Sequence, residues 1–332
     1  MGNFGYWEKR LVRVGIVGTG YAAKLRAQTF QQDARSHVVG VVGHTPEKTQ
    51  EFAQTHQTEA FTSWDELVQA DLDLIVISNV NKEHGAIATA ALQNNKHVVV
   101  EYPLALDVTE AENVVTLAQN RGKMLHVEHI ELLGSLHQAL KQNLSALGEV
   151  FYARYATVTP QHPAPHKWTY HKDLFGFPLV AALSRLHRLT DLFGEVASVS
   201  CQNRYWGEGE FYQACLCTAQ LKFTSGVIAE VTYGKGETVW QDERKFEIHG
   251  KKGGLIFEGD VGKLVSTEGT TPIELGSRRG LFAKDTDMVL SHLLTGTDMY
   301  VTPSASLYTL KVADAARQSA QTGETVVVTS SK

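Results

Sequence analysis

Apolar and polar residues follow two different patterns along the chain, and the change between them lies near residue 148. Up to about residue 130, short continuous apolar runs alternate with stretches in which apolar residues recur every three to four positions. Continuous apolar runs are typical of strands buried on both faces of a parallel sheet, and the stretches between them are long enough for crossover helices. We therefore predict strands at 12–17, 38–42, 73–78, 96–101 and 124–127, and helices at 21–31, 47–55, 63–69, 84–94 and 108–121.

After about residue 148 the pattern becomes an alternation of apolar and polar residues. The segments 149–158, 215–223 and 227–233 all alternate in this way. Such alternation is typical of antiparallel strands that have one buried face. Further strands are expected at 196–205, 244–249, 254–258 and 263–267, and helices at 179–193, 281–294 and 304–319. The sequence thus predicts an α/β domain over 1–130, followed by an α+β domain with a large open, mainly antiparallel sheet over 131–332.

Composition and charge narrow the class of protein. The 332 residues carry a formal net charge of −5 and 43% of them are hydrophobic, which excludes a disordered chain and a broad basic surface for nucleic acid. No apolar run approaches the roughly 18 residues that span a bilayer, and the first ten residues are expected to be a polar lead-in without a signal peptide. Three cysteines without CxxC spacing argue against a disulfide scaffold. We therefore expect a cytoplasmic protein, monomeric or homodimeric, that binds neither nucleic acid nor membranes. No metal is expected either, because the pair His162-x-x-x-His166 has no third ligand at helical spacing.

A glycine-rich turn follows the first predicted strand. In the motif Gly18-x-Gly20-x-x-Ala23, the first glycine permits a tight turn, the second lets the backbone approach a pyrophosphate, and the small third residue lets helix and strand pack closely. The phosphates would bind at the helix N-terminus, where free N–H groups and the helix dipole attract anions. The motif predicts a Rossmann domain, with a doubly wound parallel sheet. Its cofactor is expected to contact Gly18, Thr19, Gly20, Tyr21, Ala22 and Ala23.

The end of the second predicted strand indicates which dinucleotide binds. NAD-specific sites usually place Asp or Glu there to bind the ribose diol. Here the segment GHTP at 43–46 holds no acidic residue, and Lys48 follows it. An imidazole, a hydroxyl and a nearby ammonium suit a 2′-phosphate, so NADPH is predicted, with NADH as the weaker alternative and Gly43, His44 and Thr45 as contacts. The alternative is that His44 and Thr45 are loop residues, with Thr45 capping the next helix.

Polar residues also follow the third and fourth predicted strands. Asn79-x-Asn81-x-x-His84 follows the third strand, and the sequence KHVVVEYP at 96–103 contains the fourth. Ligands bind at the C-terminal ends of the strands in open α/β sheets. Cofactor contacts are therefore expected from Ser78, Asn81, His84 and Glu101. A capping role for His84 and a buried structural role for Glu101 are the alternatives.

These two motifs resemble those of the Gfo/Idh/MocA oxidoreductases, in which an Asn-x-x-His turn is followed by a GKHVxxEKP strand. The resemblance implies a Rossmann domain followed by an open antiparallel sheet. The Lys that sugar dehydrogenases of that family use as a catalytic base or relay is Tyr102 here, and the segment 176–188 lacks their Asp-x-Gly-x-His pattern. Oxidising an alcohol needs a base that takes the hydroxyl proton. Oxidation of a carbinol is therefore disfavoured.

The Glu-Tyr-Pro variant, together with Ser-Arg at 184–185, resembles the biliverdin reductases, and the cyanobacterial ones most of all. The similar blocks are RVGIVGTGYAA (13–23), EYPLAL (101–106), LHVEHIELLG (125–134), GEVFYARY (148–155), GFPLVAALSR (176–185) and GSRRGLF (276–282). The resemblance implies NADPH-dependent reduction of biliverdin IXα to bilirubin at the central methine bridge. Two alternatives stay open: another dehydrogenase of the same superfamily that acts on a sugar or an imine, and a non-catalytic regulator that senses NADP(H) or a bilin.

The resemblance also points to residues for this reaction. Arg185 is expected to position the lactam or pyrrole groups and a proton-bearing water, because a guanidinium is itself a poor proton donor. Tyr102 is the secondary donor, and Glu101 is expected to orient it. The two propionates of biliverdin need cationic anchors. The candidates for these anchors are Arg188, Lys235 and Arg244. Arg185 and Glu128, the latter after the fifth predicted strand, are further candidates for substrate contact. The alternatives are a surface ion pair for Arg185, a ring packed over the strand end for Tyr102, and solvated charges for the anchors.

Overall fold

The computed structural model describes residues 11–277 and 279–329, and contacts divide the chain into two compact units. The first, here called the N-terminal domain, extends to Ile130 and also includes Gly280–Leu307. The second, the C-terminal domain, comprises Glu131–Arg279 and the chain from Tyr308 onward. The first unit thus reaches Ile130, where the α/β domain was expected to end, and it also contains 280–307, which the sequence analysis placed in the second domain. The predicted polar lead-in at 1–10 lies outside the described residues.

A six-stranded sheet forms the centre of the N-terminal domain. Its strands are β1 (Val12–Val17), β2 (Ser36–Val42), β3 (Glu59–Ala60), β4 (Leu74–Ile77), β5 (His97–Glu101) and β6 (Leu125–Glu128). All neighbouring strands are parallel, and their order is β3-β2-β1-β4-β5-β6. The predicted doubly wound Rossmann sheet is confirmed; only the two-residue β3 had no counterpart among the predicted strands. Because the strand order reverses between β1 and β4, the crevice for a ligand lies at their carboxyl ends.

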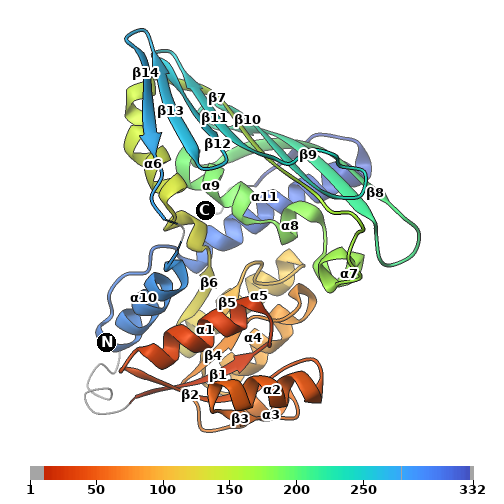
Figure 1. Cartoon of the computed structure of the whole chain (residues 1–332), viewed down its shortest axis with the longest axis vertical. Helices are drawn as coiled ribbons and strands as arrows, with labels where there is room; N and C mark the ends of the chain where they lie inside the picture. The colour runs from red at the N-terminus through yellow and green to blue at the C-terminus, as the bar shows by residue number, and fades with distance from the viewer. Residues whose placement is uncertain (1–10, 278, 330–332) are drawn as a thin grey trace. The chain divides into compact units, whose positions relative to one another are not determined.

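Six described α-helices of this domain flank the sheet (Figure 1). They are α1 (Tyr21–Gln32), α2 (Pro46–His56), α3 (Trp64–Gln69), α4 (His84–Gln93), α5 (Val108–Arg121) and α10 (Leu281–Thr295). Side-chain caps stabilise the N-termini of two of these helices. Ser63 accepts a hydrogen bond from the backbone N–H of Glu66 before α3, and Asp107 accepts one from that of Glu110 before α5. The late helix α10 belongs here because Val289 and Leu290 are buried in the same apolar core as strand β1 and helix α1.

The C-terminal domain is built on a nine-stranded sheet. Its strands are β7 (Val150–Pro160), β8 (Val196–Trp206), β9 (Ala214–Phe223), β10 (Ile228–Gly236), β11 (Glu243–Gly250), β12 (Gly253–Glu258), β13 (Val261–Ser266), β14 (Gly269–Glu274) and β15 (Val326–Val327). Their order is β14-β13-β12-β11-β7-β10-β9-β8-β15. The only parallel neighbours in this described sheet are β7 and β10. The predicted mainly antiparallel sheet is confirmed, whereas β14 and β15 were not predicted.

Helices of the C-terminal domain gather on one face of this sheet (Figure 1). They are α6 (Ser135–Asn143), α7 (Lys172–Phe175), α8 (Pro178–Ala181), α9 (Ser184–Phe193) and α11 (Pro303–Thr322), whose first residues, up to Leu307, belong to the N-terminal domain. The helix predicted at 179–193 is interrupted at Ala182, where ψ is 38°, so that α8 and α9 are separate. This break places Arg185 in the first turn of α9 rather than in the middle of a long helix.

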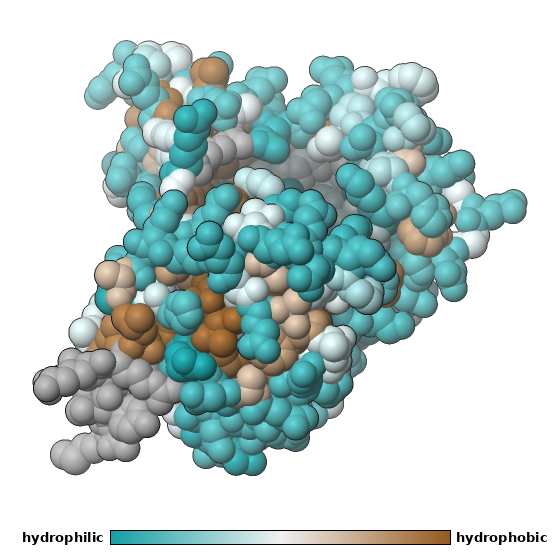
Figure 2. Space-filling model, turned by 60° about the horizontal axis from the view of Figure 1, so that its bottom comes forward, coloured by the Kyte–Doolittle hydropathy of each residue, from teal (hydrophilic) through white to brown (hydrophobic). Residues whose placement is uncertain are grey.

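Hydrophilic residues cover most of the molecular face seen in Figure 2, although apolar residues also gather in a patch on it. Within the described part of the chain, the helices are all too short or too polar to cross a membrane.

Candidate active site

The turn after β1 has the shape that a dinucleotide phosphate requires. Gly18 has φ +126°, and a Cβ at this position would lie 2.4 Å from the carbonyl oxygen of Ser78, so only glycine fits. Gly20 precedes α1, and a Cβ there would meet nothing within 4 Å, which leaves the backbone open. Nearby, Ser78 Oγ and Asn79 Oδ1 are buried without a hydrogen-bond partner among the described residues. The residues present thus fit a bound pyrophosphate at the start of α1.

The loop after β2 carries the residues expected to select the cofactor. His44 is exposed and follows Gly43 directly. Thr45 is the N-cap of α2 and accepts a hydrogen bond from the backbone N–H of Lys48 at 3.4 Å, as the alternative interpretation predicted. Capping occupies one lone pair of the Thr45 hydroxyl, and contact with a 2′-phosphate stays a prediction for both residues.

We expect His44→Asp to lower the preference for NADPH over NADH, measured as the ratio of kcat/KM values, by at least about tenfold. A carboxylate repels the 2′-phosphate and accepts hydrogen bonds from the ribose diol of NADH. Thr45 should be kept, because losing its cap would cost about 1 kcal/mol. His37→Asp is the matched control, because His37 is an exposed histidine at the opposite end of β2. An equal ratio in both variants would refute the role of His44.

Three polar residues after β4 were expected to contact the cofactor, and the structure assigns one of them a supporting role. His84 is 1% exposed at the start of α4. Burial lowers the pKa of His84, so the neutral ring donates its Nδ1–H to the carbonyl oxygen of Pro103 at 2.8 Å. His84 therefore connects α4 to the turn after β5, as the capping alternative implied. Ser78 and Asn81 are also buried, and their contact with cofactor stays a prediction.

Glu101, the last residue of β5, belongs to a buried ion network. Its Oε1 accepts from Nε of Arg26 at 3.0 Å, and the guanidinium of Arg26 also binds Asp285 of α10. Arg26 and Asp285 are both completely buried. Although burial opposes ionisation, the charges of Arg26 and His126 hold the pKa of Asp285 well below its usual range. The network fixes the orientation of Glu101 beside Tyr102.

Tyr102 and Glu128 also lie in the N-terminal domain. The Tyr102 ring stacks on the ring of His129, with centroids 5.3 Å apart and planes at 5°. His129 is held by Ser306 Oγ at 2.9 Å and by the hydroxyl of Tyr300. Glu128 is 2% exposed and accepts from the backbone N–H of Ile130. Glu128 is thus a buried carboxylate with a structural hydrogen bond to a neighbouring residue, and its contact with substrate stays a prediction.

Arg185 lies against the helix-covered face of the C-terminal sheet. Its Nε donates to Thr157 Oγ1 at 3.3 Å, its Nη1 donates to Ser184 Oγ at 2.9 Å, and its guanidinium lies 5.6 Å from the centroid of the Tyr233 ring. Thr157 is in register with Tyr233 on one side and with Arg244 on the other. Directly paired residues point to the same face of a sheet. Arg244 is therefore on the face that Arg185 contacts, and it is exposed.

Lys235 has an environment unlike that of a free propionate anchor. Its ammonium lies 3.8 Å from the ring centroid of Phe175 and 4.5 Å from that of Tyr170, and it donates to the carbonyl oxygen of Thr169. Only 9% of the residue is exposed. Burial lowers the pKa of Lys235 to about 8. Since rings and a carbonyl already surround the ammonium, Lys235 stabilises the segment 169–175 on the sheet.

Arg188 is the predicted anchor whose guanidinium has unsatisfied N–H groups among the described residues. It lies one turn after Arg185 in α9 and is 6% exposed. Its Nε and Nη1 have no hydrogen-bond partner in the part of the chain that the structure describes. A buried guanidinium with free N–H groups is costly unless an anion or water satisfies it. This arrangement is what an anion-binding arginine requires.

Sequence interpretation missed the residues that hold the site in place. Arg26 could have been noticed, because it is a charge among the apolar positions Ala23, Ala27 and Phe30 of one helix face. Asp285 and the aromatic residues around Lys235 gave no such signal, since their partners are distant in sequence. The three described cysteines are buried and free, and among the described residues no group of three potential ligands is arranged to hold a metal.

Comparison with known proteins identifies the class. Residues 12–129 match the model of the oxidoreductase family with an NAD-binding Rossmann fold, and 141–328 match that of the C-terminal alpha/beta domain of the same family. The chain therefore belongs to the Gfo/Idh/MocA oxidoreductase family, as its motifs predicted.

Within this family the chain is an NAD(P)-dependent oxidoreductase and a homologue of biliverdin reductase. It is similar to the crystal structure of biliverdin reductase from Synechocystis sp. PCC 6803 in complex with biliverdin and NADP+, with 53% identity and a TM-score of 0.92 over 93% of this chain and 99% of that one. Biliverdin reductase A of Mus musculus is 26% identical over 86% of this chain and 87% of its own length. A levoglucosan dehydrogenase in complex with NADH, at 17% identity and a TM-score of 0.83 over 97% of this chain and 100% of that one, shares the fold alone.

Proposed function

We propose that this protein reduces biliverdin IXα to bilirubin with NADPH. The observation that carries the proposal is the 53% identity to the Synechocystis enzyme, which extends over 93% of this chain. When bound, NADPH supplies the hydride that is added to the central methine carbon, and a proton is added to a neighbouring pyrrole nitrogen. The residues of this chain must therefore hold the pigment flat, bind its carboxylates and deliver one proton.

Arg185 is proposed as the residue that positions the reacting part of the pigment. Its guanidinium is held by Thr157 and Ser184 and lies over Tyr233, so its plane is fixed before substrate binds. A planar fork of N–H donors suits lactam oxygens and a bridging water. Because arginine stays protonated at any ordinary pH, the proton itself comes from the water that Arg185 holds.

Tyr102 is proposed as a secondary proton donor. Its ring is fixed by stacking on His129, and the preceding Glu101 is fixed by Arg26. The buried network therefore acts on the reaction only through the orientation of Glu101 and Tyr102. Phenols donate protons readily when they are positioned close to the acceptor.

Arg188 and Arg244 are proposed as the anchors for the two propionates. Arg188 has free N–H donors in a buried setting, and Arg244 is exposed on the face that Arg185 contacts. Charge-assisted bonds from arginine to carboxylate are stronger than neutral hydrogen bonds. Lys235 is proposed to support this region rather than to bind a propionate, because its ammonium is already enclosed.

The proposal is tested by mixing the protein with NADPH and biliverdin and recording the absorption spectrum. We expect the long-wavelength bilin band to give way to a bilirubin band at the rate at which NADPH is consumed. Biliverdin binding without any spectral turnover would favour the regulator instead. Oxidation of sugars with NADP+, with no reaction on biliverdin, would favour the sugar dehydrogenase.

A further inference from the structure

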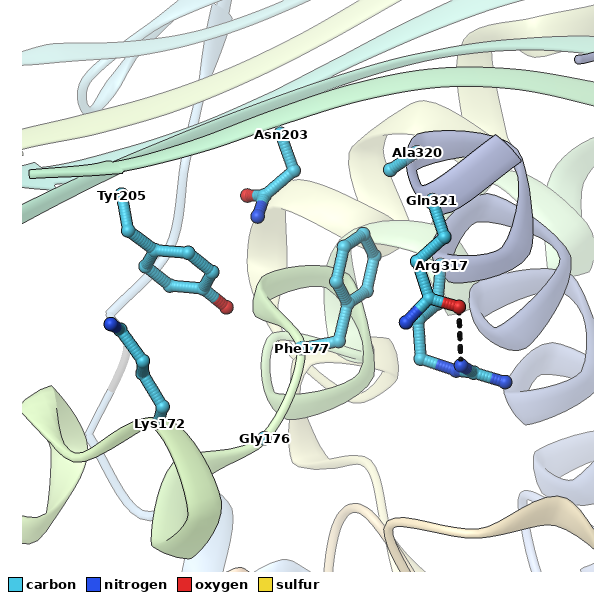
Figure 3. Close-up of a pocket in the computed structure, with 8 residues that line it drawn as sticks. All are labelled: Lys172, Gly176, Phe177, Asn203, Tyr205, Arg317, Ala320 and Gln321. Atoms are coloured by element: carbon cyan, nitrogen blue, oxygen red, sulfur yellow. Dashed lines mark hydrogen bonds between the residues drawn. The ribbon is translucent and has the colours of Figure 1, made fainter. Parts of the chain in front are cut away.

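A pocket of about 320 Å³ lies within the C-terminal domain, and none of the residues proposed for cofactor binding, substrate binding or proton transfer lines it. Figure 3 shows it between strand β8, helix α11 and the link from α7 to α8. It is lined by Lys172, Gly176, Phe177, Asn203, Tyr205, Arg317, Ala320 and Gln321. Its volume is at the lower end of the range of small-molecule sites, roughly 300–1,000 Å³, and is too small for a whole tetrapyrrole.

The pocket is separate from the place where Arg185 lies. Arg185 contacts residues of β7 and β10, whereas the pocket is lined by residues of β8. Strand β9 lies between β10 and β8, and α8 packs against β9. A ligand in this pocket would therefore bind on the other side of α8 from Arg185.

None of the lining residues is acidic, and most of their polar groups are donors; the exception is Asn203 Oδ1, a buried acceptor without a hydrogen-bond partner among the described residues. The ammonium of Lys172 donates one hydrogen bond to the carbonyl oxygen of Gly209, at 2.8 Å, which leaves two N–H groups for a ligand. The oxygen of Gln321 is bound by Nη1 of Arg317 at 2.9 Å, so its amide NH₂ is left for a ligand (Figure 3). Burial raises the pKa of Tyr205, so its hydroxyl keeps its proton. Arg317 is already paired with Asp314 at 2.7 Å, so the donors that stay available for an anion are those of Lys172, Gln321 and Tyr205.

Two rings give the pocket its shape. Phe177 and Tyr205 both present their rings to the cavity in Figure 3, and the hydroxyl of Tyr205 is directed into it. Ring faces favour the stacking of a flat aromatic body. The ammonium of Lys172 lies 5.7 Å from the Tyr205 ring centroid, so the positive charge lies beside the same flat surface.

We propose that this pocket binds a planar aromatic carboxylate, with its ring between Phe177 and Tyr205 and its carboxylate on Lys172 and the Tyr205 hydroxyl. Such a ligand satisfies the free donors and neutralises the local charge. This site is proposed as distinct from the one at Arg185, although Tyr205 and Tyr233 pack against the same cluster of Tyr170 and Tyr212.

The test uses 2-naphthoate as the probe and the full-length protein, with the dissociation constant measured by calorimetry or ligand-observed NMR. We expect 2-naphthoate to bind at least tenfold more tightly than 2-naphthamide, which has the same shape without the charge. Lys172→Gln and Tyr205→Phe should each weaken 2-naphthoate at least fivefold. Lys167→Gln, at an exposed lysine that does not line the pocket, is the matched control and should leave its affinity unchanged.

The outcomes separate this site from the bilin site. Binding of 2-naphthoate that persists in Arg185→Ala and in saturating biliverdin supports the proposal. Equal affinity for the acid and the amide, or equal affinity in Lys172→Gln and Lys167→Gln, would overturn it. Displacement of the probe by one equivalent of biliverdin would also overturn it, because the pocket would then be part of the bilin site. None of these binding measurements depends on turnover of biliverdin.

Discussion

Replacing Arg185 by alanine is expected to lower kcat/KM for biliverdin by at least about a hundredfold, because preorganised donors at a reacting group typically contribute 10²–10³ in rate. The guanidinium is held in one plane by Thr157, Ser184 and the ring of Tyr233, so the alanine variant loses both the charge and the oriented N–H groups. The turnover number should fall more than the Michaelis constant rises, since the interaction belongs to the reacting part of the pigment.

Two controls distinguish this role from a structural one. The affinity for NADPH should stay within about twofold of the wild type, because Arg185 lies in the C-terminal domain and the phosphate-binding turn lies in the other. Arg185→Lys keeps the charge but loses the planar fork, so it should recover only a small part of the activity. Full activity in Arg185→Ala, measured by the appearance of bilirubin, would remove Arg185 from the mechanism.

Asp285→Asn is expected to lower the free energy of unfolding by about 3–5 kcal/mol, the usual cost of removing one partner from a buried ion pair. Asp285 is completely buried and binds Arg26, Nε2–H of His126 at 2.8 Å and the hydroxyl of Tyr300 at 2.7 Å. The neutral amide leaves the buried guanidinium with Glu101 and Glu128 as its acidic neighbours.

The same helix offers a matched control. Asp287 also lies on α10 and pairs with Arg35 at 2.7 Å, but its side chain is 65% exposed. Asp287→Asn should therefore cost less than about 1 kcal/mol. Urea unfolding of both variants measures the difference, and equal losses would contradict the assigned role of the buried network.

The sequence was sufficient for the parts of the fold that depend on local pattern. The turn at Gly18 requires a residue without a Cβ, and the apolar runs of β4 and β5 are continuous because both faces are buried. These constraints act within a few residues, so the Rossmann domain was predicted strand by strand except for the short β3. The alternation in β9 likewise predicted a strand with one buried face.

Features that depend on distant contacts were missed. Helix α10 has an ordinary amphipathic pattern, and only its packing against α1 assigns it to the N-terminal domain. The parallel pairing of β7 with β10 likewise comes from topology rather than pattern. Nothing in the sequence distinguishes Lys235 from a lysine on the surface. Its contacts with the rings of Phe175 and Tyr170 arise only when the chain folds. Long-range pairing leaves no periodic signal in the chain.

The central claim is that the hydride of NADPH is transferred to the central methine carbon of biliverdin, and isotope transfer tests it most directly. The reaction would be run separately with NADPH carrying deuterium on each face of the nicotinamide C4, and the bilirubin analysed by mass spectrometry and NMR. The account predicts one deuterium per product molecule at the central bridge, from one of the two labelled forms. Bilirubin without deuterium from either form, or deuterium at any other carbon, would contradict it.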